Sequence, residues 1–79
     1  MTDSEVKERA AWFGRGVPKA EMHCIGPTFP ECVDRWLPKL RGALVRNSDD
    51  PPDGFATEQE AIAAAARFRD GCAAWAARH

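Results

Sequence analysis

The sequence predicts a mainly α-helical fold: a small single domain, residues 1–79, built as a bundle of three to four helices and closed by a long C-terminal helix. Two observations favour this fold class. Three Thr–Glu pairs have the three-residue spacing of a helix-capping box, and they begin at Thr2, Thr28 and Thr57. Apolar residues recur at helical steps after each of these threonines.

The first predicted helix covers residues 3–13. Val6, Ala10 and Phe13 follow one another at steps of four and three residues, so they share one helix face. Gly14 supplies a stop directly after the last of them.

The middle of the chain predicts one short strand, Ala20–Ile25, followed by two short helices, Phe29–Leu37 and Pro38–Val45. The two helices are separated because a proline in a helix interior removes a hydrogen bond and costs about 3 kcal/mol. Residues 47–54 are rich in Asp and Pro, as a loop is. The helical interpretation depends on apolar residues at helical spacing: Val33, Trp36, Leu37, Leu40 and Leu44.

The last predicted helix runs from about Glu58 to Ala77. Gly71 is its weak point, since glycine in a helix interior costs about 0.5–1 kcal/mol relative to alanine. The run of alanines at 63–66 has little volume and would let a neighbouring element approach closely. A single apolar stripe follows the whole helix: Ala61, Ala65, Phe68, Cys72 and Trp75.

The alternative is an α+β fold, in which a short sheet packs on the C-terminal helix. Leu40–Arg46 would then be a strand and Phe55-Ala56 the end of another, both paired with Ala20–Ile25. The phrase Gly54-Phe55-Ala56-Thr57 is typical of a strand leading into a helix. We prefer the helical interpretation, although short apolar runs distinguish poorly between a helix and a strand.

Composition argues against several classes of function. The net charge of −1 is typical neither of a nucleic-acid binder nor of an acidic disordered tail. No apolar run approaches the ~18 residues that cross a bilayer, so we expect no membrane contact. Three cysteines are too few for a disulfide-stapled scaffold, which predicts a cytoplasmic protein.

The residue spacings predict no enzyme, no metal site and no cofactor. Seven residues separate Cys24 from Cys32, whereas zinc knuckles place cysteines two to four apart. A calcium loop starting at Asp49 would end on Glu60, but its third position is Pro51, which has no side-chain oxygen. No Cys–His or Ser–His pair stands at a spacing that indicates a nucleophile and its base.

These exclusions leave binding as the expected function. We expect a non-enzymatic accessory or inhibitor protein that acts on a larger protein complex, and the Ala- and Arg-rich usage suits a bacteriophage or mobile-element source. The alternatives are a weak nucleic-acid-binding accessory protein, which would use the basic residues of the middle segment, and a homodimer. Aromatic and arginine side chains are the usual anchors of interfaces. The predicted partner-binding residues are Trp12, Phe13, Arg35, Trp36, Lys39 and Arg41.

Overall fold

A computed structural model describes residues 2–26 and 33–79. Two helices, α1 and α2, accompany a three-stranded antiparallel sheet in the order β1-β2-β3. The fold is therefore α+β, and the predicted helical bundle is wrong. The elements along the chain are α1 (Asp3–Gly14), β1 (Pro18–Ile25), β2 (Val33–Leu40), β3 (Ala43–Leu44) and α2 (Glu58–Arg78).

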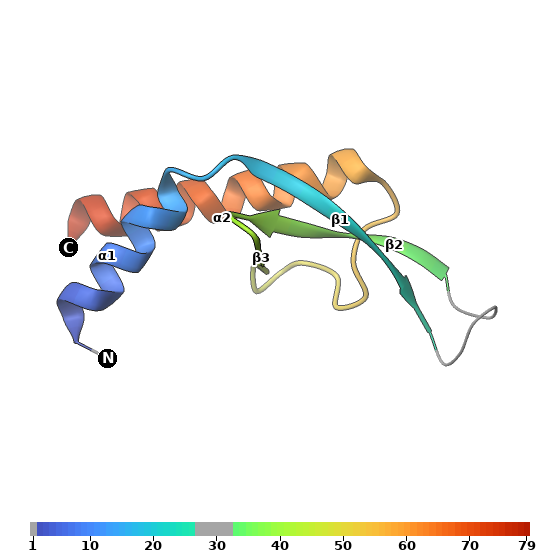
Figure 1. The fold of residues 1–79 in the computed structure, drawn as a ribbon, viewed down its shortest axis with the longest axis horizontal. Helices are drawn as coiled ribbons and strands as arrows, with labels where there is room; N and C mark the ends of the chain where they lie inside the picture. The colour runs from blue at the N-terminus through green and yellow to red at the C-terminus, as the bar shows by residue number, and fades with distance from the viewer. Residues whose placement is uncertain (1, 27–32) are drawn as a thin grey trace.

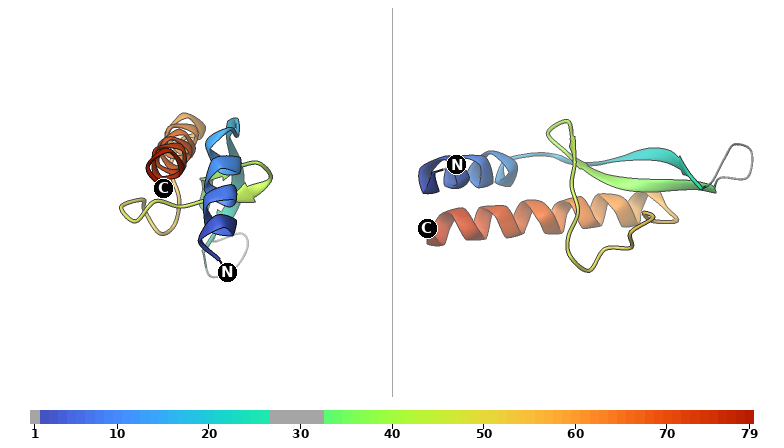
Figure 2. Two further views of the ribbon diagram at one scale, coloured as in Figure 1. Left: turned by 90° about the vertical axis from the view of Figure 1, so that its left-hand side faces the viewer. Right: turned by 90° about the horizontal axis from the view of Figure 1, so that it is seen from below.

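The long helix α2 organises the molecule. Its first half lies along the β1–β2 hairpin, and its second half lies beside α1 (Figure 1). The hairpin projects beyond the start of α2, which makes the molecule elongated, with extents of 45 × 25 × 21 Å (Figure 2). A single helix thus joins the two parts of the domain.

Both predicted terminal helices are confirmed, together with their caps. Thr2 accepts a hydrogen bond from the backbone N–H of Glu5 (3.3 Å). The Thr57 hydroxyl accepts a hydrogen bond from the backbone N–H of Glu60 (3.2 Å). It also donates a hydrogen bond to the Glu60 carboxylate (2.9 Å). Each cap satisfies an N–H group that the helix itself leaves unpaired.

The middle of the chain corrects the sequence interpretation. Val33–Leu40 is strand β2 rather than parts of two helices; positions 29–32 of the first predicted helix, and the predicted cap at Thr28, lie outside the described residues. The apolar positions fit either period, because Trp36, Pro38 and Leu40 also alternate as in a strand. Pairing with β1 along all eight residues decides between the two periods.

Pro38 is compatible with β2 because of the direction in which its backbone points. Trp36 exchanges two backbone hydrogen bonds with Phe55, both 2.8 Å long, on the side away from β1. Two residues along, Pro38 faces the same side, where its carbonyl accepts from the N–H of Val45 (3.0 Å). The missing N–H of Pro38 therefore removes no hydrogen bond between β2 and β1.

A tight turn at Arg41 and Gly42 joins β2 to β3. Both residues have positive φ, 50° and 81°, as a type I′ hairpin turn requires. The predicted strand at Leu40–Arg46 is therefore only Ala43–Leu44, since Leu40 belongs to β2. Phe55 does add an isolated bridge, but to Trp36 of β2 and not to Ala20–Ile25.

The core lies between α2 and the covered face of the sheet. Leu40 is fully buried, as are Ala61, Ala64 and Ala65 of α2, and Pro38 is buried beside them. Alanines on the buried side of α2 allow the sheet to approach the helix closely, as their small volume predicts. The core is small, so each buried contact contributes a large share of the stability.

Two glycines test the packing of the helices against each other. A Cβ on Gly14 would lie 2.9 Å from the Cβ of Ala73 and 3.0 Å from its Cα, whereas one on Gly71 would meet nothing within 4 Å. Gly14→Ala should lower the free energy of unfolding by about 1–3 kcal/mol, because α1 must move away from α2. Gly71→Ala, the matched control, should raise it by about 0.4–1 kcal/mol. Urea unfolding measures both; equal effects would contradict the close approach of the helices.

Candidate functional site

One face of the hairpin carries a row of basic side chains. Pro38 and Leu40 of β2 are buried against α2, so the alternating residues Arg35 and Lys39 point to the opposite face. The register pairs Lys19 with Lys39, which brings Lys19 to the same face. Arg35 and Lys39 lie about 13 Å apart along the strand.

The β2–β3 turn extends this row toward α1. The guanidinium of Arg41 lies over the ring of Trp12, 4.4 Å from its centroid. Trp12, Arg41 and Lys19 line a cavity of about 310 Å³ together with Val17, whose exposed fraction is 67%. We call Lys19, Arg35, Lys39 and Arg41 the basic face.

Glu21 is an acidic residue within this face, and its carboxylate already interacts with His23 and Lys39 of the same chain. Its carboxylate lies 3.0 Å from Nε2 of His23 and accepts a hydrogen bond from Nζ of Lys39 (3.3 Å). The hydrogen bond with His23, followed by the hydrogen bond and the charge of Lys39, holds the pKa of Glu21 below its ordinary value of 4.5. Glu21 thus offsets part of the charge of Lys39 and leaves Lys19, Arg35 and Arg41 for other anions.

Lys19 and Lys39 stand directly opposite each other across the hairpin. Like charges in this position destabilise a sheet. An anion held between the two ammonium groups would remove that repulsion. Glu21 of the same chain already places a carboxylate on Lys39, so part of this repulsion is offset within the isolated chain.

The structure divides the predicted partner-binding residues into separate places. Arg35 and Lys39 do share a face, but of a strand, and Trp36 between them points to the other side, with Met22 as its cross-strand partner. Phe13 packs edge-on against Phe68 of α2, with ring centroids 5.7 Å apart. Of the two adjacent rings at the end of α1, Trp12 is the one beside the basic face.

Lys19 is the member of the basic face that is absent from the predicted partner-binding residues. The predicted strand began at Ala20, whereas β1 begins at Pro18. The alternation of Lys19, Glu21 and His23 gives the same period-two signal as the apolar residues between them. Extending the strand by two residues would have placed Lys19 on the polar face.

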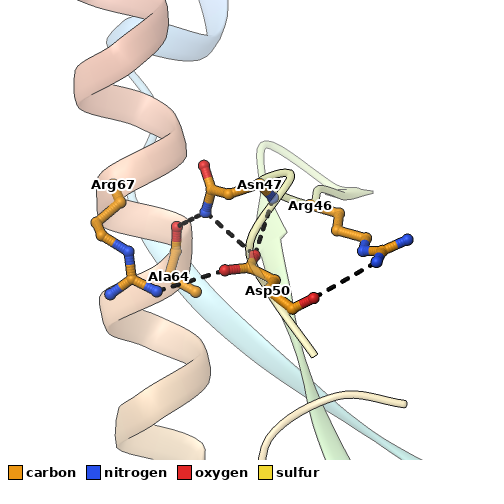
Figure 3. Close-up of polar contacts among 5 residues, drawn as sticks. All are labelled: Arg46, Asn47, Asp50, Ala64 and Arg67. Carbon is orange, nitrogen blue, oxygen red and sulfur yellow. Dashed lines mark hydrogen bonds and ion pairs between the residues drawn. The ribbon is translucent and has the colours of Figure 1, made fainter. Parts of the chain in front are cut away.

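A second polar cluster fixes the loop after β3 to α2 (Figure 3). Asp50, whose side chain is 2% exposed, accepts from the backbone N–H of Asn47 (2.9 Å) and from its Nδ2 (3.1 Å). Asn47 Nδ2 also donates to the carbonyl of Ala64 in α2 (3.0 Å), and Arg67 lies 3.4 Å from the Asp50 carboxylate. Its donors and acceptors are matched within the chain, so we assign it a structural role.

Cys24 and Cys72 are in different chemical states. Cys24 takes part in a disulfide bond. Cys72 is a free thiol on a cavity of about 580 Å³ between α1, α2 and the loop after β3, and burial raises its pKa. Within residues 2–26 and 33–79, no three His, Cys, Asp or Glu side chains are grouped to hold a metal ion.

Comparisons with known proteins leave the basic face as the principal guide to function. No protein-family model matches the chain, and neither a curated protein nor a solved structure shows significant similarity to it. Neither α1 nor α2, the helices of the described part of the chain, is long and apolar enough to cross a membrane.

Proposed function

We propose that this chain is a non-enzymatic binding module, an accessory or inhibitor protein that holds an acidic segment of a protein partner on its basic face. The observation that carries the proposal is the arrangement of Lys19, Arg35 and Lys39 on the face of the sheet opposite α2, with Arg41 of the β2–β3 turn lying over Trp12 beside Lys19. This face is positive, although the whole chain has a net charge of −1. Such segregation steers an oppositely charged partner toward one surface.

Trp12 supports the proposal at one end of the basic face. A tryptophan beneath an arginine offers apolar area next to charge, which is the usual composition of an interface anchor. Val17 adds exposed apolar surface beside it. A partner segment with acidic residues and one apolar side chain would match both parts of the surface.

Nucleic acid is the second candidate ligand, favoured by the opposed pair Lys19 and Lys39 beside Trp12. Phosphates would neutralise the two ammonium groups, and the ring would offer a stacking surface. The acidic Glu21 in the middle of the face favours the protein ligand, because a peptide can place its acidic side chains on the basic residues alone, whereas a nucleic-acid backbone carries a phosphate at every nucleotide.

A charge reversal at Lys19 tests the proposal. Lys19→Glu should lower affinity for the partner at least about tenfold. It should not lower the melting temperature, because Glu opposite Lys39 is a favourable cross-strand pair. Lys7→Glu on the exposed part of α1 makes the same change of charge away from the basic face and should leave binding intact. The measurement is a pull-down of the tagged chain from bacterial lysate, with and without nuclease, read by mass spectrometry.

The pattern across the two variants decides the result. A protein retained by wild type and Lys7→Glu but lost with Lys19→Glu, with and without nuclease, supports the protein ligand. Loss on nuclease treatment, with DNA affinity that falls steeply between about 50 and 200 mM salt, supports the nucleic-acid candidate. Equal capture by wild type and both variants would contradict a role for the basic face.

A further inference from the structure

The cavity beside Trp12 contains two cations that no acid of the chain offsets. Lys19 and Arg41 both line it, and none of the described residues around it is acidic. Neither Lys19 nor Arg41 forms an ion pair with another described residue, whereas Lys39 pairs with Glu21. An anionic group that enters this cavity therefore meets two positive charges that are not already held by a carboxylate.

The side chain of Arg41 is held in place at this cavity. Its backbone has a φ of 50°, at a turn position where Asn, Asp or Gly is usually preferred. A Cβ on Gly16 would lie 2.7 Å from Cγ of Arg41, so the missing side chain at position 16 lets Arg41 lie against the chain. The guanidinium then lies 4.4 Å from the centroid of the Trp12 ring. Charge and apolar surface are thus fixed next to each other before a ligand binds.

This closeness restricts the kind of ligand that the cavity can take. The ligand must carry an anionic group and an apolar group only a few ångströms apart. In an extended segment, neighbouring side chains point to opposite faces, and side chains two residues apart are separated by about 7 Å. At the C-terminus of a chain, the carboxylate and the last side chain are instead bonded to the same Cα atom. A C-terminal residue therefore presents both groups to one cavity.

We infer that the cavity beside Trp12 binds the C-terminal residue of the partner segment. The terminal carboxylate binds to Lys19 and Arg41, and the last side chain, which is apolar, lies against Trp12 and Val17. The volume of about 310 Å³ is at the low end of the roughly 300–1,000 Å³ found for ligand pockets, so one residue fills it. The inference rests on the proposed function, because the preceding acidic residues of the segment continue along the rest of the basic face.

Two peptides of equal charge test the position of the carboxylate. Acetyl-Glu-Ala-Glu-Ala-Leu ends in a free carboxylate, whereas acetyl-Glu-Ala-Glu-Leu-Glu amide has the same net charge and a blocked end. The first peptide should bind the wild-type chain at least about tenfold more tightly. The indole N–H signal of Trp12 in a two-dimensional NMR titration reports binding at the cavity, and Trp12→Phe identifies that signal. This comparison needs no variant to fold.

A variant of Arg41 provides the second measurement. Arg41→Lys keeps the charge but loses the planar guanidinium, which binds a carboxylate through two parallel hydrogen bonds. It should weaken binding of the free-acid peptide at least about fivefold and of the amide peptide less than about twofold. Lys7→Gln removes a charge from the exposed part of α1 and should change neither affinity. Far-UV circular dichroism checks the fold of both variants.

The outcomes separate this inference from the proposed function. Tighter binding of the free-acid peptide, reduced by Arg41→Lys, supports the inference. Equal affinity for the two peptides, or equal loss of both with Arg41→Lys, would overturn it and leave the basic face as a binding surface. Equal affinity for acetyl-leucine alone would assign the cavity to a small carboxylic acid and would also overturn it. Binding of neither peptide up to about 5 mM would contradict the basic face itself, and the inference with it.

Discussion

Asp50→Ala is expected to lower the free energy of unfolding by about 2–4 kcal/mol. Asp50 is the buried acid of the chain's described part, with 5% of the whole residue exposed, and its carboxylate is the acceptor for both amide groups of Asn47. Alanine would leave these donors and the nearby Arg67 without their acceptor. Because the loop after β3 is joined to α2 through Asn47 and the carbonyl of Ala64, the loop should also loosen from the helix.

The neighbouring acid supplies the control for this prediction. Asp49 is exposed, so Asp49→Ala makes the same chemical change one residue away and should alter stability by less than about 0.5 kcal/mol. Urea unfolding followed by circular dichroism measures both variants. Hydrogen exchange of the Asn47 amide should rise only with the change at Asp50. Equal destabilisation by the two variants would contradict the structural role of the cluster.

Leu40→Ala is expected to cost about 2–4 kcal/mol, because the side chain is fully buried at the end of β2. Neighbouring parts of the chain approach it closely: a Cβ on Gly16 would lie 2.8 Å from Cδ1 of Leu40. The space left by alanine could be filled only by moving the segment between α1 and β1. A domain of this size has only about 4–12 kcal/mol of stability, so the variant should be partly unfolded well below the wild-type melting temperature.

The same substitution in β3 is the control. Leu44 is 49% exposed, and Leu44→Ala should cost less than about 1 kcal/mol. Thermal and urea unfolding of the two variants should therefore differ clearly. A cost at position 40 no greater than at position 44 would show that the core does not lie between α2 and this end of the sheet.

Local signals were enough to predict the two helices. The capping threonines Thr2 and Thr57, the apolar steps that follow them and the glycine after the first helix all act within one or two turns. Interactions of this range are formed by neighbours in the sequence, so no tertiary contact is needed to recognise them. Ala20–Ile25 was likewise recognised as extended from its alternation, and it lies within β1.

The segment from Val33 to Leu40 could not be assigned from its own residues. Its apolar positions fit a helix and a strand equally, and Pro38 counts against a helix without naming the alternative. Two sets of tertiary contacts make this segment a strand. β1 supplies a partner for every residue of β2, and Phe55 forms backbone hydrogen bonds with Trp36 on the other side of β2. These partners belong to other segments of the chain, so the periodicity of β2 alone carries no record of them.

The basic face depends on the same tertiary decision. Arg35 and Lys39 share a side in a helix and in a strand, so the sequence determined that they belong together. Only the pairing of β1 with β2 brought Lys19 opposite Lys39, and only the turn at Arg41 brought a guanidinium over Trp12. The sequence by itself thus determined the two helices and their caps, because these depend on neighbouring residues. The tertiary structure decided the sheet and its charged surface, because strand pairing joins residues that are distant along the chain.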